Sequence, residues 1–329
     1  MPIRPLLSCL LAATMLGGMV SAGRAADKWD NDFFWGMDDP HQISQADDTI
    51  RLRGGIGMLF LYGDEYVFNG DSTLSHLKWD SRMPVLRGSV DLDVGHGVSV
   101  RAEGSVAGLG SSYMEDYDWM IPTNNFDDWT HRSQHPDTQV DHYFTGALSL
   151  GYELARQPDA VVRLHGGLKY TDVQWSAQGG SYIYSVNGFR DTVGSIPDGV
   201  PAITYRQQLP ELFLGFDGDQ RYGNIRLGGL LRGGVTFLGR AHDDHWLRDL
   251  RIEDSFLIAP AISVGADMGL ALGRNAELFI AARYDQAFQM RGRAVYTDTV
   301  SNQVLIAEDD IAGAGLRGIE VSAGLTGKF

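Results

Sequence analysis

The chain has 329 residues, a formal net charge of −15, 41 glycines and 10% aromatic residues. This acidic balance argues against a nucleic-acid partner, because phosphates repel such a surface. The one cysteine is Cys9, close to the N-terminus, which excludes a disulfide scaffold.

Residues 1–25 have the pattern of a secretory signal peptide. Arg4 provides a positive start, residues 5–20 are almost wholly apolar, and Gly23 and Ala25 are the small residues of a cleavage site. The apolar run is too short to span a bilayer, although a retained N-terminal anchor is the alternative. Cleavage would remove Cys9, Arg4 and Arg24, which leaves 25 basic and 42 acidic residues and a net charge of −17. We expect residues 26–329 to form a single domain.

Alternating apolar and polar residues predict an all-β fold. In residues 276–288, Leu278, Ile280 and Tyr284 alternate with charged residues. Such alternation is typical of strands with one face toward lipid and the other toward a wet lumen. An exported chain without an 18-residue apolar run, ending on Phe329, favours a closed transmembrane barrel, because lipid offers backbone groups no hydrogen-bond partners.

Ten antiparallel strands are predicted in chain order. They cover residues 48–66, 74–94, 96–110, 140–155, 159–177, 202–217, 222–240, 253–270, 275–293 and 313–329. Short joints at 93–97, 157–159, 218–223 and 273–275 alternate with long polar stretches at 64–73, 111–139, 178–201, 241–252 and 294–312. In outer-membrane barrels the long loops lie outside the cell, so the stretches 111–139, 178–201 and 241–252 should share one extracellular rim.

Two clusters of titratable residues lie in the predicted rim. Asp116 and Asp118 are two residues apart, so in an extended chain they point the same way and can share a proton. Asp243 and His245 have the same spacing, and a carboxylate beside an imidazole raises its basicity, as a general base requires. If the pairs face each other, they could hold a water molecule between them. On composition alone, solvated loops or loosely bound Ca²⁺ remain alternatives.

Four rim motifs give the chain a resemblance to the omptin family of outer-membrane proteases. They are Asp116-Tyr117-Asp118-Trp119-Met120, Trp129-Thr130 with His135-Pro136-Asp137-Thr138, the run 176–185 with Gly188-Phe189-Arg190-Asp191, and Arg240-Ala241-His242 with Asp243-Asp244-His245 and Arg248-Asp249-Leu250. The similarity continues in order from about residue 50 to Phe329.

The resemblance implies an endopeptidase that cuts at basic sites. Asp243 would orient His245, His245 would activate the attacking water, and Asp116 with Asp118 would position that water and transfer protons. Glu65 would bind the basic side chain of the substrate. The second acidic residue of that subsite has no counterpart, because Ala241-His242 stands in its place.

The resemblance also implies lipopolysaccharide as a requirement for activity, with no other cofactor and no metal. Two arginines that family members use for this contact correspond to Gln174 and Gln208. We expect cationic peptides or proteins as substrates, a monomer, and an outer-membrane location with the site facing outward. The alternative is a non-enzymatic barrel, an adhesin or a narrow pore, that retains the omptin rim.

Overall fold

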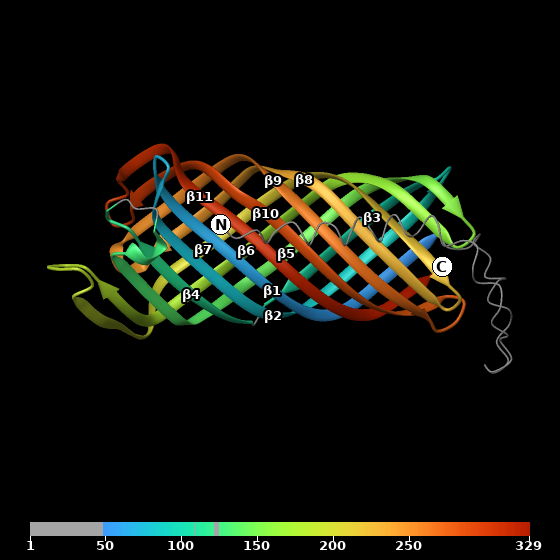
Figure 1. The fold of residues 1–329 in the computed structure, drawn as a ribbon, viewed down its shortest axis with the longest axis horizontal. Helices are drawn as coiled ribbons and strands as arrows, with labels where there is room; N and C mark the ends of the chain where they lie inside the picture. Colours follow the sequence, from blue (N-terminus) through green and yellow to red (C-terminus); the bar gives the residue numbers. More distant parts are fainter. Residues whose placement is uncertain (1–48, 109, 122–124) are drawn as a thin grey trace.

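The computed structural model describes residues 49–108, 110–121 and 125–329, so the expected signal peptide lies outside the described residues. The described chain forms one sheet of long antiparallel strands (Figure 1). The strands are β1 (Ile50–Asn69), β2 (Ser72–Gly95), β3 (Val98–Ala107), β4 (Ser111–Asp118), β5 (His131–Gln157), β6 (Ala160–Tyr184), β7 (Thr192–Tyr222), β8 (Ile225–His245), β9 (Leu250–Ala271), β10 (Ala276–Asp298) and β11 (Val304–Lys328). Within the described residues, no helix is both long and apolar enough to span a membrane.

The sheet closes on itself as a ten-stranded barrel. β1 pairs with β2 on one side and with β11 on the other. β3 and β4 both lie between β2 and β5, so they are two parts of one barrel strand. The eleven labelled strands therefore occupy ten positions, and the predicted architecture is confirmed.

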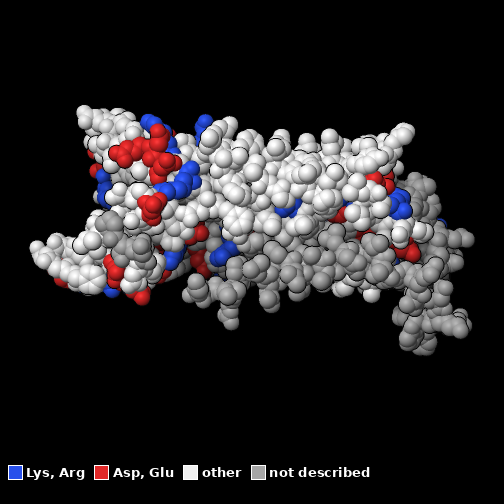
Figure 2. All heavy atoms as spheres, turned by 45° about the horizontal axis from the view of Figure 1, so that its top comes forward, with Lys and Arg blue, Asp and Glu red and all other residues white. Residues whose placement is uncertain are grey.

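The outer surface of the barrel carries an apolar belt. Outward side chains in its middle are large and apolar, among them Ile56, Leu148 and Leu214, whereas inward neighbours such as Ser149 are buried and polar. The space-filling view shows this belt as an uncharged band between two charged ends (Figure 2). A belt of this kind suits lipid, where an outward charge at mid-depth would cost about 2–4 kcal/mol.

At one end the strands continue well beyond this belt, and there the predicted boundaries were wrong. Much of 111–139, 178–201, 241–252 and 294–312 is strand rather than loop, since β4 lies inside the first stretch and β8 runs on to His245. The reason is physical: above the lipid both faces of a strand meet polar surroundings, so the apolar alternation stops while the backbone pairing continues. The short turns predicted at the opposite end are present, for example between β5 and β6.

An aromatic layer crosses the barrel just below the extended end. Trp79, Trp175 and Tyr205 stack with ring centroids 5.6–6.0 Å apart, and the Trp175 indole donates a hydrogen bond to Ser81 at 2.9 Å. Tyr205 is the register partner of Asp243 on β8. Tyr205 therefore places the edge of this layer directly beside Asp243.

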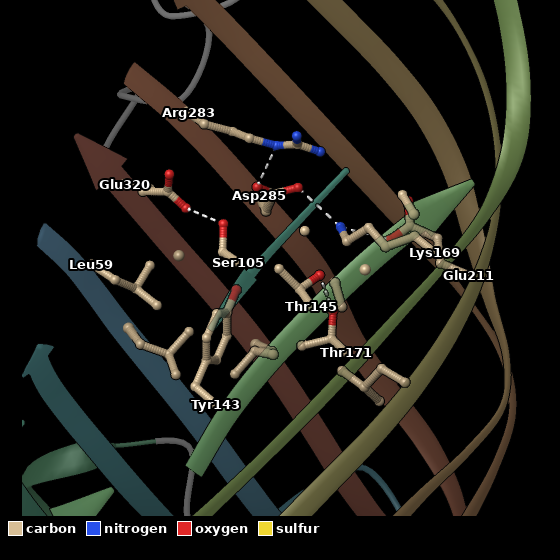
Figure 3. Close-up of a pocket in the computed structure, with 18 of the residues that line it drawn as sticks. Leu59, Ser105, Tyr143, Thr145, Lys169, Thr171, Glu211, Arg283, Asp285 and Glu320 are labelled. Atoms are coloured by element: carbon tan, nitrogen blue, oxygen red, sulfur yellow. Dashed lines mark hydrogen bonds and ion pairs between the residues drawn. The ribbon is translucent and has the colours of Figure 1, made fainter. Parts of the chain in front are cut away.

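Below the aromatic layer the lumen contains ion pairs. The Lys169 ammonium lies 2.9 Å from Asp285 and 3.0 Å from Glu211, and Arg283 also pairs with Asp285 (Figure 3). Arg283 contacts Glu103 as well. The cavity between these side chains holds about 50 Å³. Paired charges, rather than an open channel, fill this section of the barrel.

Candidate active site

Asp243 and His245 form a buried ion pair at the outer end of β8. Their spacing places both on the inward face, where Asp243 is 1% and His245 6% exposed. The Asp243 Oδ2 atom lies 2.5 Å from the His245 Nε2 atom. The sequence prediction that the two side chains share a face is therefore confirmed, and the carboxylate lies against Nε2 of the imidazole.

Asp116 and Asp118 lie at the outer end of β4 and also point inward. Burial, and next the charge of Asp118, raise the pKa of Asp116 well above its usual range. Burial likewise raises the pKa of Asp118. Ser75 of β2 lowers the pKa of both aspartates, against the effect of burial. Its hydroxyl donates a 3.2 Å hydrogen bond to Asp116 Oδ1. Two such carboxyls titrate as a pair that can keep one proton.

The two pairs belong to the same end of the barrel and influence each other. The charge of Asp243 contributes to the raised pKa of Asp116, and the charge of His245 lowers that of Asp118. Strands β4 and β8 both run toward the extended end (Figure 1), so the four predicted residues belong to the same end of the barrel.

Arg248 is a member of this site that the sequence prediction missed. It closes the short 3-10 turn η4 (Trp246–Arg248), which follows β8, and its guanidinium donates to His245 Nδ1. Its charge also lowers the pKa of Asp116 and of Asp118. Arg248 therefore contacts one ring nitrogen of His245 while Asp243 contacts the other, and its charge also acts on the carboxyl pair of β4. Arg248-Asp249-Leu250 belongs to the fourth rim motif of the family resemblance, but the sequence prediction gave Arg248 no role.

Glu65 lies inside the barrel on β1, beside the Asp243–His245 pair. Its side chain is 2% exposed. Burial first, and then the charges of Asp243 and Asp254, raise its pKa well above the usual range. The structure thus places Glu65 next to the dyad. It also brings in Asp254 of β9, which no motif indicated.

The remaining family motifs hold the rim together. His135, 1% exposed, donates from Nδ1 to the Gly179 carbonyl at 2.6 Å and contacts Ser133 at 2.9 Å through Nε2. Gly180 has a φ of +119°, and a Cβ there would lie 2.3 Å from the Gln134 carbonyl, so only glycine fits. Arg190 stacks 3.5 Å above the Trp129 ring and donates to the Trp129 carbonyl. These residues support the site rather than belong to it.

In the part of the chain that the structure describes, no group of three or more His, Cys, Asp or Glu side chains is arranged to hold a metal ion. The chemistry that the geometry offers is proton transfer between an imidazole and carboxyls.

Comparison with known proteins identifies the family. The model of the omptin family matches residues 46–329. The chain belongs to the omptin family. It is 28% identical to Protease 7 of Escherichia coli K12, over 79% of this chain and 84% of that protein. It is 27% identical to the outer membrane protease OmpP of the same organism, over 93% and 94%, and 26% identical to the plasminogen activator of Yersinia pestis, over 86% and 90%.

The fold agrees with this assignment. The crystal structure of the outer membrane protease OmpT from Escherichia coli is similar with a TM-score of 0.81 and 26% sequence identity, covering 88% of this chain and 100% of that one. This omptin is therefore an outer-membrane β-barrel, and its relatives support a protease function.

Proposed function

We propose that this omptin is an endopeptidase that cleaves cationic polypeptides with a water molecule activated between Asp243–His245 and Asp116–Asp118. The observation that supports the proposal most strongly is the 2.5 Å contact between Asp243 and His245, facing two carboxyls of raised pKa. An imidazole held by a carboxylate is a base, and a carboxyl pair that retains a proton is an acid.

The base nitrogen in this mechanism is Nδ1 of His245, because Nε2 is held by Asp243. Nδ1 would take a proton from water as the water oxygen attacks the carbonyl carbon of the scissile bond. The Asp116–Asp118 pair would orient that water and supply a proton to the amine that leaves when the C–N bond breaks. Arg248 donates to Nδ1 in the substrate-free site, so the guanidinium must move aside before the water can bind.

A preference for basic residues follows from the surrounding charge. Glu65 is buried beside the dyad, and the chain carries 42 acidic against 27 basic residues. A cationic side chain would be attracted to the rim and stabilised next to this carboxylate.

Lipopolysaccharide is proposed as the activating lipid. Arg206 lies on the outer face at the level of Gln174 and Gln208, and it makes a bidentate ion pair with Asp172. Its charge is therefore partly neutralised, and an anionic lipid would have to compete with Asp172. Refolding in detergent with and without lipopolysaccharide, followed by activity measurements, tests this dependence.

The proposed reaction is tested with refolded protein and a short peptide that contains paired Arg and Lys residues. We expect cleavage that resists chelators and falls by about 10²–10⁴-fold in His245→Ala, as expected when a general base is lost. Asp116→Ala, Asp118→Ala and Asp243→Ala should also give folded barrels of low activity. Near-normal turnover by folded His245→Ala protein would reject the mechanism.

A further inference from the structure

Besides Asp243 and Glu65, another buried carboxylate lies near the Asp243–His245 pair. It has no role in the proposed proton transfers. Asp254 is on the inward face of β9 and is 6% exposed. Its register partner on β8 is Ala241, two residues before Asp243. Among the described residues, no hydrogen-bond partner is found for Asp254 Oδ1.

Glu65 and Asp254 share the same surroundings. The Glu65 Oε2 atom also has no hydrogen-bond partner within the described part of the chain. The two carboxyls and Asp243 are close enough for the charges of both aspartates to raise the pKa of Glu65. Burial and the charge of Asp243 likewise raise the pKa of Asp254 well above its usual range.

Two buried carboxylates with vacant acceptor atoms are costly to keep. Buried polar groups nearly always have partners, and an unpaired charge in such surroundings destabilises the fold. The two carboxylates also act on the nearby tyrosines. Burial first, and then the charges of Glu65 and Asp254, raise the pKa of the Tyr205 and Tyr296 hydroxyls. An arrangement that is unfavourable by itself becomes favourable when a cation enters it.

We propose that Asp254 and Glu65 jointly bind the Arg or Lys side chain next to the scissile bond, which makes Asp254 a specificity-determining residue. The inference rests on the proposed function, because it assigns the binding site that serves the Asp243–His245 pair. A guanidinium has five donors and can contact two carboxylates at once. Since Ala241 supplies no acid on β8, the second carboxylate comes from its neighbour across the ladder.

The experiment compares two peptides that differ at one position, with arginine in one and its neutral isostere citrulline in the other. Wild-type protein, Asp254→Asn and Glu65→Gln are assayed for kcat/KM on both. Glu253→Gln is the matched control, because it removes the same charge one residue away, on the exposed outer face of β9. Circular dichroism confirms that each variant is folded.

We expect wild-type protein to prefer the arginine peptide and Asp254→Asn to lose about 10- to 100-fold on that peptide, the usual effect of a lost hydrogen bond to a charged group. Cleavage of the citrulline peptide should change little, and Glu253→Gln should behave as wild type. Asp254→Glu keeps the charge and should retain most of the preference. If Asp254→Asn does not fold, Asp254→Ser takes its place.

Two results would overturn the assignment. One is an unchanged arginine-to-citrulline ratio in Asp254→Asn, which includes equal losses on both peptides. The other is a ratio that collapses in Asp254→Glu as fully as in Asp254→Asn. In each of these the wild-type enzyme still cleaves, so the proposed function survives. Absence of cleavage of either peptide by folded wild-type protein would instead remove the proposed function itself.

Discussion

Ser75 controls how easily the carboxyl pair of β4 ionises. Its hydroxyl donates to Asp116 and lowers the pKa of both Asp116 and Asp118, against the effect of burial. Removing the donor in Ser75→Ala should raise both pKa values, so the acidic limb of the kcat/KM profile should move to higher pH by about one unit. The measurement is a pH profile beside Ser255→Ala, an exposed serine on β9. A limb that stays in place would show that the pair does not govern it.

The buried carboxylate of Asp254 should make the barrel less stable as the pH rises. Because its pKa is higher in the folded than in the unfolded chain, the folded state holds the proton more tightly. That contribution to stability is complete below 3.8, the ordinary value for aspartate, and is lost as the pH passes the raised value. Asp254→Asn should therefore increase the free energy of unfolding near pH 8 by about 1 kcal/mol, and by much less in acid.

Chemical unfolding of Asp254→Asn and wild-type protein at the two pH values provides the measurement, with Glu253→Gln as control. A destabilised Asp254→Asn near pH 8 would mean that the carboxylate has a structural partner. The two properties of Asp254 are linked: a residue that binds a substrate cation should cost stability when the substrate is absent.

At the scale of strands, the sequence predicts best where lipid imposes a pattern. Within the belt, every second side chain must be apolar, so period two indicated the strands and the ten-stranded barrel. Above the belt that constraint ends, and the outer parts of β4, β5 and β6 were taken for loops. Spacing within one strand was enough to pair Asp116 with Asp118 and Asp243 with His245.

Residues contributed by other elements were beyond such reasoning. Ser75 donates a hydrogen bond to Asp116 from β2, and the charge of Asp254 on β9 raises the pKa of Glu65. These meetings depend on the register between strands and on barrel closure, and neither leaves a local signal in the sequence. The family motifs indicated which loops meet, but not the acid that faces Ala241.

The turn η4 supplies the next prediction, since it places Arg248 on the base nitrogen. The turn ends at Asp249 in the left-handed region with a φ of 51°, and this conformation follows directly on Arg248. In Arg248→Ala, Nδ1 of His245 is no longer capped and water can bind it, so kcat/KM for short peptides should rise by about 5-fold at pH values above the acidic limb. Arg251→Ala is the control, because Arg251 pairs with Asp244 on the outer face. Lower activity in Arg248→Ala would show that the guanidinium assists the reaction.

For the molecule as a whole, the interior is divided along the barrel axis. Paired charges fill the membrane-embedded lumen, the stacked rings of Trp79, Trp175 and Tyr205 close it, and the candidate site lies above them. This order argues against the alternative of a narrow pore, because conduction would require both layers to open. It also means that the site depends on a lumen that does not collapse.

The substitution Glu103→Ala measures how much the ion pairs of the lumen contribute to the free energy of unfolding. Glu103 contacts Arg232, Arg283 at 3.0 Å and Arg87 at 3.8 Å, and Arg232 is 1% exposed. Glu103→Ala leaves these cations without their shared partner, and Arg232 is buried, so the free energy of unfolding should fall by about 3–5 kcal/mol. Unfolding by denaturant from detergent or lipid measures the change.

Glu153→Ala is the matched comparison for Glu103→Ala. Glu153 pairs with Arg156, whose side chain is 43% exposed, so its loss should cost less than about 1 kcal/mol because water replaces the partner. Equal effects of the two substitutions would mean that water screens the lumen as it does the surface. The ion pairs of the lumen would then not be what stabilises the barrel beneath the site. A large difference, with peptide cleavage falling in parallel with stability, would instead tie the geometry of the rim to the charges buried below it.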